Sequence, residues 1–184
     1  MKNPGTQIIE TERLVLRRFE YSDCDSVLRN WAADESVQLQ YGEPVYSTKE
    51  EVNGVLDKYI KSYEDDNKYR WAIIEKASGE CIGQAAFFLV DTKNHFAEIE
   101  YCIGTAFQRR GYATEATRAL IKYGFDIIEL HKVQICVRPV NASSKRVIEK
   151  CGFKYEGTLR DYFFKDGHYE DRMYFSILRN EFYS

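Results

Sequence analysis

Residues 108–116 have the sequence Gln108-Arg109-Arg110-Gly111-Tyr112-Ala113-Thr114-Glu115-Ala116. They follow an apolar, strand-like segment at residues 97–104 and open a helical pattern that continues to about Ile128. The first amide groups of a helix lack intrahelical partners and carry the positive end of the dipole, so they bind anions such as phosphate. Gly111 allows a close approach of the backbone, and Arg109 and Arg110 add charge suited to phosphate oxygens. The segment therefore predicts a phosphate-binding loop between a strand and a helix.

The spacing of this loop excludes two common phosphate-binding fingerprints. The chain contains no Gly-x-x-x-x-Gly-Lys-Ser/Thr run, which would bind a nucleoside triphosphate. It also contains no Gly-x-Gly-x-x-Gly run, which would bind a dinucleotide. The loop therefore predicts a phosphate ligand of another class.

The composition is that of one folded domain. The chain has 184 residues, of which 44% are hydrophobic and 30% are charged, and this mixture predicts a substantial core and excludes a disordered chain. The net charge of −3 gives no field that would recruit nucleic acid or an acidic membrane surface. We expect neither partner.

Cysteine usage and the N-terminus predict a cytoplasmic protein. The five cysteines form no Cys-x-x-Cys pair, and their odd number favours reduced thiols over disulfides or a zinc site. The three histidines show no metal-ligand spacing, so we expect no metal. Residues 1–7 are polar, and no apolar run approaches the roughly 20 residues that a membrane helix requires.

Periodicity predicts the order strand, two helices, three strands, helix, strand, helix and two strands. Helices are expected to begin at Ser22, capped with Asp25 and ending near Trp31, and at Thr48, capped with Glu51. Residues 32–46 are expected to form an irregular loop. Strands are expected at residues 14–16, 69–75, 81–90, 97–103, 133–137, 153–159 and 169–178, and further helices at residues 114–128 and 143–150. This order predicts an α/β fold with helices on both faces of a mixed sheet.

A second informative segment lies downstream of the loop. It has the sequence Asn141-Ala142-Ser143-Ser144-Lys145-Arg146-Val147-Ile148-Glu149-Lys150-Cys151-Gly152-Phe153 and is followed by Glu156-Gly157. The Gln-x-x-Gly-x-Ala pattern at Gln108 resembles the acetyl-coenzyme A pyrophosphate loop of GNAT-type N-acetyltransferases. The second segment resembles the one after the fifth strand of those enzymes. Both motifs occur in the expected order, and the resemblance covers nearly the whole chain.

The two ends of the chain extend this resemblance to one branch of the superfamily. Residues 11–17, together with residues 156–160 and 171–174, resemble the branch that contains ribosomal-protein N-terminal alanine acetyltransferases. The resemblance implies a single GNAT domain over residues 1–184. It also implies a mixed central sheet of about seven strands, flanked by about four helices and splayed between strands four and five.

The resemblance implies a set of coenzyme contacts. In the family, free backbone groups of the fourth strand pair with pantetheine, and the matching positions are Tyr101, Cys102 and Ile103, whose side chains alone indicate core. The family also uses an asparagine at the position of Asn141 against pantetheine. Lys145 is expected to reach a phosphate, although most lysines on short helices face solvent. The residues expected around the pyrophosphate are Gln108, Arg109, Arg110, Gly111, Tyr112, Ala113 and Thr114.

Two carboxylates are candidates for handling the proton of the attacking amine. Glu98 and Glu100 share one face of a central strand, where carboxylates are costly unless they face water or a site. The family often has a glutamate at the position of Glu98, which is thought to relay this proton through water. Glu100 stands where the branch often has glycine, and it is expected to narrow the acceptor site or to bind a cation. The alternative is that both carboxylates face solvent at a splayed strand edge.

Ser144 is the candidate acid for the leaving thiolate. It matches a serine with that proposed role in the branch, whereas many GNAT enzymes use a tyrosine at the position of Ile148. The missing tyrosine either shifts the role to Ser144 or leaves it to water. Helix capping next to Asn141 is the structural alternative for Ser144.

The expected activity is acetyl transfer from acetyl-coenzyme A to a primary amine by direct attack, without a covalent enzyme intermediate. The acceptor is either a protein N-terminus or a small amine such as a polyamine, amino sugar or aminoglycoside. Trp31 and Tyr41 are expected to border it, with core packing as the alternative. A non-catalytic acyl-coenzyme A sensor or scaffold and a nucleotide-binding protein are the rival functions. A homodimer is compatible with the resemblance.

Overall fold

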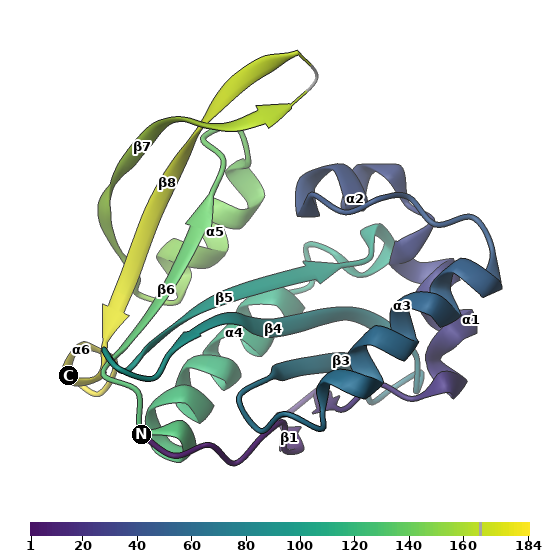
Figure 1. Cartoon of the computed structure of the whole chain (residues 1–184), viewed down its shortest axis with the longest axis horizontal. Helices are drawn as coiled ribbons and strands as arrows, with labels where there is room; N and C mark the ends of the chain where they lie inside the picture. The colour runs from purple at the N-terminus through teal and green to yellow at the C-terminus, as the bar shows by residue number, and fades with distance from the viewer. Residues whose placement is uncertain (166) are drawn as a thin grey trace.

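A computed structural model describes residues 1–165 and 167–184 (Figure 1). One sheet of eight strands runs through the chain in the order β1-β2-β3-β4-β5-β6-β8-β7. The strands are β1 (Ile9–Glu10), β2 (Leu14–Arg17), β3 (Tyr69–Glu75), β4 (Cys81–Asp91), β5 (Phe96–Ile103), β6 (Lys132–Val137), β7 (Lys154–Lys165) and β8 (His168–Leu178). The helices are α1 (Cys24–Val27), α2 (Glu35–Tyr41), α3 (Lys49–Ser62), α4 (Tyr112–Tyr123), α5 (Ala142–Lys150) and α6 (Arg179–Phe182). The predicted mixed α/β sheet is confirmed, with one strand more than expected.

The sheet separates between β5 and β6. These two strands are parallel, but their pairing covers only Phe96–Ile99 against Lys132–Ile135. β5 then continues to Ile103 along β4, while β6 continues to Val137 along β8. Figure 1 shows the two strands diverging, with α2 beyond the end of β5 and the β7–β8 hairpin beyond β6. The expected splay is confirmed at this place.

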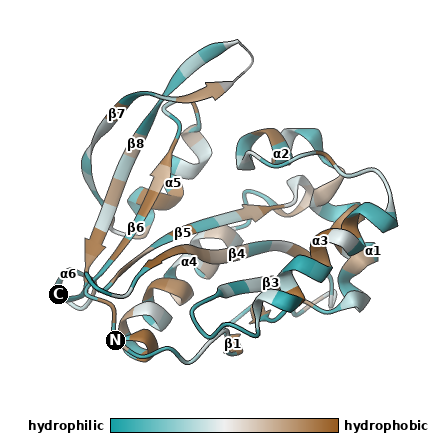
Figure 2. Ribbon diagram, viewed as in Figure 1, coloured by the Kyte–Doolittle hydropathy of each residue, from teal (hydrophilic) through white to brown (hydrophobic). Residues whose placement is uncertain are grey.

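Helices cover both faces of the sheet. α4 and α5 pack on one face, where Leu120, Ile121 and Ile148 join the larger core. α1 and α3 pack on the other face, where Val52 and Leu56, four residues apart, lie side by side on α3. Figure 2 shows hydrophobic and hydrophilic segments together on α3, as expected for a helix with one buried face.

The structure corrects three expected elements. The first helical region begins earlier than Ser22, because Glu20 and Asp23 form the capping box in place of Ser22 and Asp25. It then passes through α1 into a π-helical segment, Leu28–Ala32. Within the expected loop at residues 32–46, the side chain of Asp34 accepts hydrogen bonds from the amides of Ser36 and Val37 and starts α2. β7 also extends beyond residue 159, because irregular pairing at residues 160–162 lets the strand resume at Phe163.

All five cysteines are free thiols. In the described part of the chain, no helix combines the length and apolar character needed to span a membrane. The same residues contain no group of three or more histidine, cysteine, aspartate or glutamate side chains that could hold a metal ion.

Candidate active site

A cleft of about 1260 Å³ opens where β5 and β6 separate. The start of α4 and the outer face of α5 form one part of its wall. α2, the bulge in β4 at Phe88 and the end of β7 form the other part. The cleft therefore joins a half with cationic side chains, at the start of α4 and on α5, to a half with aromatic and apolar walls.

The loop before α4 is shaped for an anion. Arg109 and Gly111 both have left-handed backbone angles, with φ of 61° and 86°. For an arginine this conformation costs roughly 1–2 kcal/mol, and such strain is concentrated at functional sites. Within the described residues no side chain caps the first turn of α4, in contrast to α3 and α5, which are capped by Thr48 and Asn141. The amides at the start of α4 are therefore available to a phosphate.

Contacts from distant parts of the chain hold this loop in place. Arg13 donates to the carbonyl oxygen of Arg110 at 2.8 Å and forms an ion pair with Glu115 of α4 at 2.6 Å. Gln108 donates from Nε2 to the carbonyl oxygen of Ile103 at 2.9 Å, which ties the loop to the end of β5. These contacts fix the backbone before any ligand binds.

The structure places most of the predicted loop residues in the cleft. Arg110 is the exception, because its guanidinium lies over the ring of Phe107, 5.6 Å from the centroid, and is absent from the described lining. The buried side chain of Tyr112 donates to Glu75 and so also serves packing. The predicted residues that line the cleft are Tyr101, Cys102, Ile103, Gln108, Arg109, Gly111, Tyr112, Ala113 and Thr114.

α5 contributes two cationic side chains other than Lys145 to the lining of the cleft. Lys145 is absent from the described lining of the cleft, whereas Arg146 and Lys150 belong to it. Arg146 and Lys150 are therefore further candidates for reaching a phosphate, and the role expected for Lys145 stays a prediction. Asn141 lines the cleft, and its Oδ1 accepts a hydrogen bond from the amide of Ser144 at 3.0 Å.

Two hydroxyl groups meet inside the cleft. The Oη of Tyr101 lies 3.1 Å from the Oγ of Ser144, and both residues line the cleft. Burial raises the pKa of Tyr101 to about 12, so the phenol carries its proton at neutral pH. The sequence indicated only a core role for the Tyr101 side chain. The structure shows that the ring packs against the core while its hydroxyl reaches Ser144.

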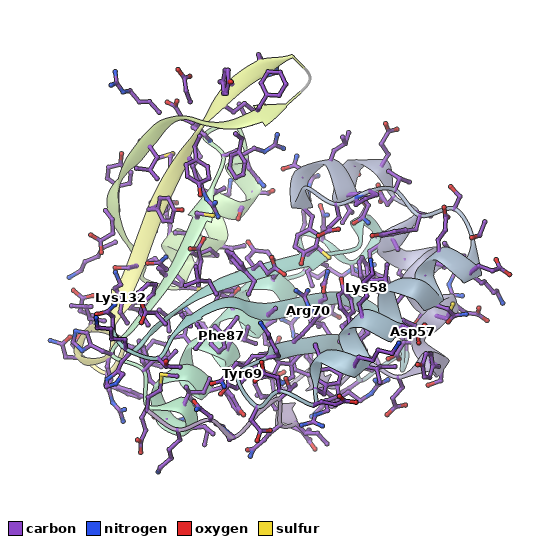
Figure 3. The ribbon with its side chains drawn as sticks, viewed as in Figure 1. Asp57, Lys58, Tyr69, Arg70, Phe87 and Lys132 are labelled. Atoms are coloured by element: carbon purple, nitrogen blue, oxygen red, sulfur yellow. The ribbon has the colours of Figure 1, made fainter. Side chains whose placement is uncertain are left out.

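Glu100 reaches the cleft from the opposite face of β5. Its Oε1 accepts hydrogen bonds from the Oη of Tyr41 and from Nη2 of Arg70, each at 2.7 Å. Arg70 belongs to β3, where Figure 3 labels it. It also donates to Gln84 and lies over the ring of Tyr59 on α3, 4.5 Å from its centroid. Tyr41 and Glu100 both line the cleft and contact each other, and their expected roles on the acceptor side stay predictions.

Glu98 lies deeper than predicted. It is 2% exposed, pairs with Nη2 of Arg172 at 2.9 Å and accepts a hydrogen bond from Nε2 of Gln134 at 2.7 Å. Arg172 belongs to the described lining of the cleft and Glu98 does not. The idea that both carboxylates face solvent at a strand edge is therefore wrong for Glu98.

Trp31 does not border the acceptor. It is 2% exposed and packs in the core between α1, α3 and the sheet, so the core alternative is the correct one. The acceptor half is instead lined by residues that sequence reasoning did not single out. They are Leu39, Phe88, Cys136, Arg138, Phe163, Phe164 and Arg172. Of these, Arg172 belongs to residues 171–174, whose sequence indicates only the resemblance to one branch of the superfamily.

The cysteines in the cleft are poor nucleophiles. Burial raises the pKa of Cys136 to about 12 and raises that of Cys102 above its usual value, so both are protonated thiols at neutral pH. Reactive cysteines require the opposite shift. At neutral pH the cleft therefore offers carboxylates, hydroxyl groups and backbone amides for chemistry, and its two cysteines as protonated thiols.

Comparisons with known proteins agree with this geometry. The family model for an acetyltransferase (GNAT) domain matches residues 13–154. The uncharacterized N-acetyltransferase p20 of Bacillus licheniformis is 31% identical over 179 residues, which cover 96% of this chain and 98% of p20. A spermidine N(1)-acetyltransferase of Vibrio cholerae is 28% identical over 172 residues, which cover 92% of this chain and 95% of that enzyme.

The fold is shared with solved structures at similar identity. An acetyltransferase of the GNAT family from Bacillus anthracis has a TM-score of 0.83 and is 28% identical, over 95% of this chain and 100% of that one. The chain therefore belongs to the GNAT family of acetyltransferases, and it is an acetyl-coenzyme A-dependent N-acetyltransferase of that family.

Proposed function

We propose that this enzyme acetylates the N-terminal amine of a peptide or protein, by direct attack on the thioester of acetyl-coenzyme A. The observation that carries the proposal is the charge of the cleft. Its described lining contains five cationic side chains, Arg109, Arg138, Arg146, Lys150 and Arg172, and two anionic ones, Glu43 and Glu100. An acceptor with one positive charge suits this lining better than a polycation does.

The coenzyme half accounts for three of the five cations. Arg109 follows β5, and Arg146 and Lys150 lie on α5, all beside the uncapped start of α4. These groups are suited to the phosphates of coenzyme A. Coenzyme A supplies the acetyl group as a thioester, and the separated strands β5 and β6 offer it a slot between them.

The acceptor half has no surplus of negative charge. Glu100 pairs with Arg70, and Glu98 pairs with Arg172. Arg138 pairs with Glu170 at 3.1 Å, and the remaining acid of the lining, Glu43, is exposed at the rim. Polyamines such as spermidine carry several positive charges and are best bound by unpaired carboxylates. The aromatic walls at Phe88, Phe163 and Phe164 suit the side chain and backbone of a peptide.

The residues in the cleft favour direct attack. Because Cys102 and Cys136 remain protonated, neither offers a thiolate that could carry the acetyl group. The hydroxyl pair of Ser144 and Tyr101 can deliver a proton to the sulfur that leaves. A carboxylate on the acceptor side can take the proton that the amine loses.

The test is a comparison of acceptors with the purified protein. Acetyl-coenzyme A would be supplied with peptides of varied N-terminal residue, with their N-terminally blocked counterparts, and with spermidine and spermine. We expect free peptides to be acetylated at the α-amine, with kcat/KM at least about tenfold above that of spermidine, a difference of about 1.4 kcal/mol. A clear preference for polyamines, or equal turnover of blocked and free peptides, would contradict the peptide acceptor. Turnover of any amine would also exclude the non-catalytic sensor.

A further inference from the structure

We infer that Glu100 is the carboxylate that receives the acceptor amine in this enzyme, and that Arg172 withholds Glu98 from that role. The inference rests on the proposed function, because it concerns the acceptor half of the same cleft. The resemblance implies that Glu98 relays the proton of the amine. The inference assigns that role to Glu100, at a position where the branch often has glycine.

Arg172 separates Glu98 from the cleft. The guanidinium is paired with Oε1 of Glu98, while Gln134 occupies Oε2, so both carboxylate oxygens have partners. The rings of Tyr162, Phe163 and Tyr174 surround the same guanidinium, with centroids 4.9–5.2 Å away. Each ring attracts the cation and keeps water from it, which holds the ion pair together.

Glu100 has the opposite surroundings. Its side chain is 26% exposed, and Arg70 and Tyr41 both contact Oε1. In the described part of the chain no hydrogen-bond donor reaches Oε2. One oxygen is therefore held by two positioning residues, which leaves the other as an acceptor that an ammonium group in the cleft can use.

The location along β5 also favours Glu100. The ladder to β6 ends at the pair Ile99–Ile135, and Glu100 is the first residue of β5 beyond it. Glu98 still pairs with Gln134 inside the closed part of the sheet. Glu100 therefore lies where the cleft begins, and Glu98 lies within the paired part of the sheet, below the cleft.

The chemical role follows from these positions. Attack forms the bond between the amine nitrogen and the acetyl carbon and breaks the bond between that carbon and sulfur. A bound ammonium first passes one proton through Glu100 to solvent, which leaves the neutral amine. The second proton, which the nitrogen loses on attack, leaves by the same route. The sulfur takes a proton from the Ser144 hydroxyl, which regains one from solvent. Arg70 and Tyr41 act through Glu100 by fixing its carboxylate.

The test compares two isosteric variants, Glu100→Gln and Glu98→Gln. The first readout is calorimetric titration of an acceptor peptide into the complex with coenzyme A, which cannot transfer an acetyl group. We expect Glu100→Gln to weaken peptide binding by about 10- to 100-fold, as for the loss of a hydrogen bond to a charged group. Glu98→Gln should weaken it less than about threefold and should instead lower the melting temperature, because Arg172 loses its buried partner.

The second readout separates kcat from KM with acetyl-coenzyme A as the donor. Glu100→Gln should lower kcat/KM for the peptide by about 10- to 100-fold, whereas Glu98→Gln should leave it within about threefold. Tyr41→Phe removes one positioning hydrogen bond without changing charge, and it should raise KM for the peptide more than it lowers kcat. If Glu100→Gln folds poorly, Tyr41→Phe still tests the role of Glu100.

The outcomes separate the two hypotheses. An active wild-type enzyme whose peptide affinity and kcat/KM fall in Glu98→Gln, and are unchanged in Glu100→Gln, would overturn the inference alone. A wild-type enzyme that acetylates no peptide would overturn the proposed acceptor and the inference with it. Retained acetyl-coenzyme A affinity in both variants shows that the losses arise on the acceptor side.

Discussion

Ser144 and Tyr101 illustrate how a hydroxyl pair can replace a single residue. The helix position that often carries a tyrosine in the family is Ile148 here, and it is fully buried. The phenol comes instead from Tyr101 on β5 and lies 3.1 Å from Ser144 on α5. We therefore expect the two groups, from two different elements, to act as one proton donor.

Removal of either hydroxyl should slow turnover without weakening coenzyme binding. We expect Ser144→Ala and Tyr101→Phe each to lower kcat by about 10- to 100-fold, in the range of general acid catalysis. Because the hydroxyl groups act together, the double variant should cost little more than either single one. Rapid-mixing measurement of free thiol release, with calorimetry of acetyl-coenzyme A as the control, provides the check. Additive losses would show two independent roles, and an unchanged rate would leave Ser144 as part of the helix start.

At the scale of elements, the junction of the loop and α4 is the feature most sensitive to change. Gly111 has φ of 86°, and a Cβ at this position would lie 3.2 Å from Nη2 of Arg13. The amides that follow it have no side-chain cap within the described residues. A carboxylate at this point would occupy the place of a phosphate and repel it.

Gly111→Asp and Gly111→Asn separate charge from shape. The two side chains have nearly the same size, and asparagine tolerates the left-handed conformation comparatively well. We expect Gly111→Asp to weaken acetyl-coenzyme A binding by about 100-fold, or about 2.7 kcal/mol, and Gly111→Asn by less than about tenfold. Calorimetric titration measures both. Equal losses would assign the effect to the backbone, and unchanged affinity in Gly111→Asp would remove the loop from the coenzyme site.

The elements differ in how far the sequence could predict them. β3 was predicted with its observed bounds, and the capping box at Thr48 was correct, because both depend on local pattern. α2 was missed, since it has only seven residues and ends at Gly42 within a segment that looks like a loop. Its helical conformation depends on the Asp34 cap and on packing against the rest of the molecule, which periodicity does not report.

The candidate site was predictable where a motif sets the backbone and unpredictable where side chains from distant segments meet. The loop around Gly111 and the cap at Asn141 follow from local sequence. The pairing of Glu98 with Arg172 joins residues 74 positions apart, so no local pattern reveals it. Arg146 rather than Lys145 lines the cleft because of the rotation of α5 against the sheet, which the local sequence likewise does not reveal.

At the scale of the whole molecule, buried tyrosines link stability to pH. Burial raises the pKa of several phenols to about 12, namely those of Tyr59, Tyr63, Tyr69, Tyr101 and Tyr123. In the unfolded chain the same groups ionise near pH 10. The folded state therefore binds more protons than the unfolded state between these values, and its stability falls as the pH rises.

We expect the free energy of unfolding to be nearly constant from pH 7 to about 8. It should begin to fall at about pH 8.5, where thiols such as that of Cys136, whose pKa is raised in the folded state, ionise in the unfolded chain, and should fall steeply between about pH 10 and 12. Urea unfolding at a series of pH values, with tyrosinate absorbance recorded in parallel, measures this. Tyr123→Phe should flatten part of the decline, although it also removes the hydrogen bond to the carbonyl oxygen of Gly5. A decline that begins well below about pH 8 would point to groups other than the thiols and phenols.

Arg13 precedes β2 by one residue, yet it holds the carbonyl of Arg110 and the carboxylate of Glu115. The beginning of the chain and the coenzyme loop are therefore ordered together, although nearly a hundred residues separate them. Coenzyme that orders the loop should therefore also reduce the motion of the N-terminal segment. A protease that cuts near residue 12 would then be slowed by acetyl-coenzyme A, which would make the N-terminus a remote reporter of an occupied cleft.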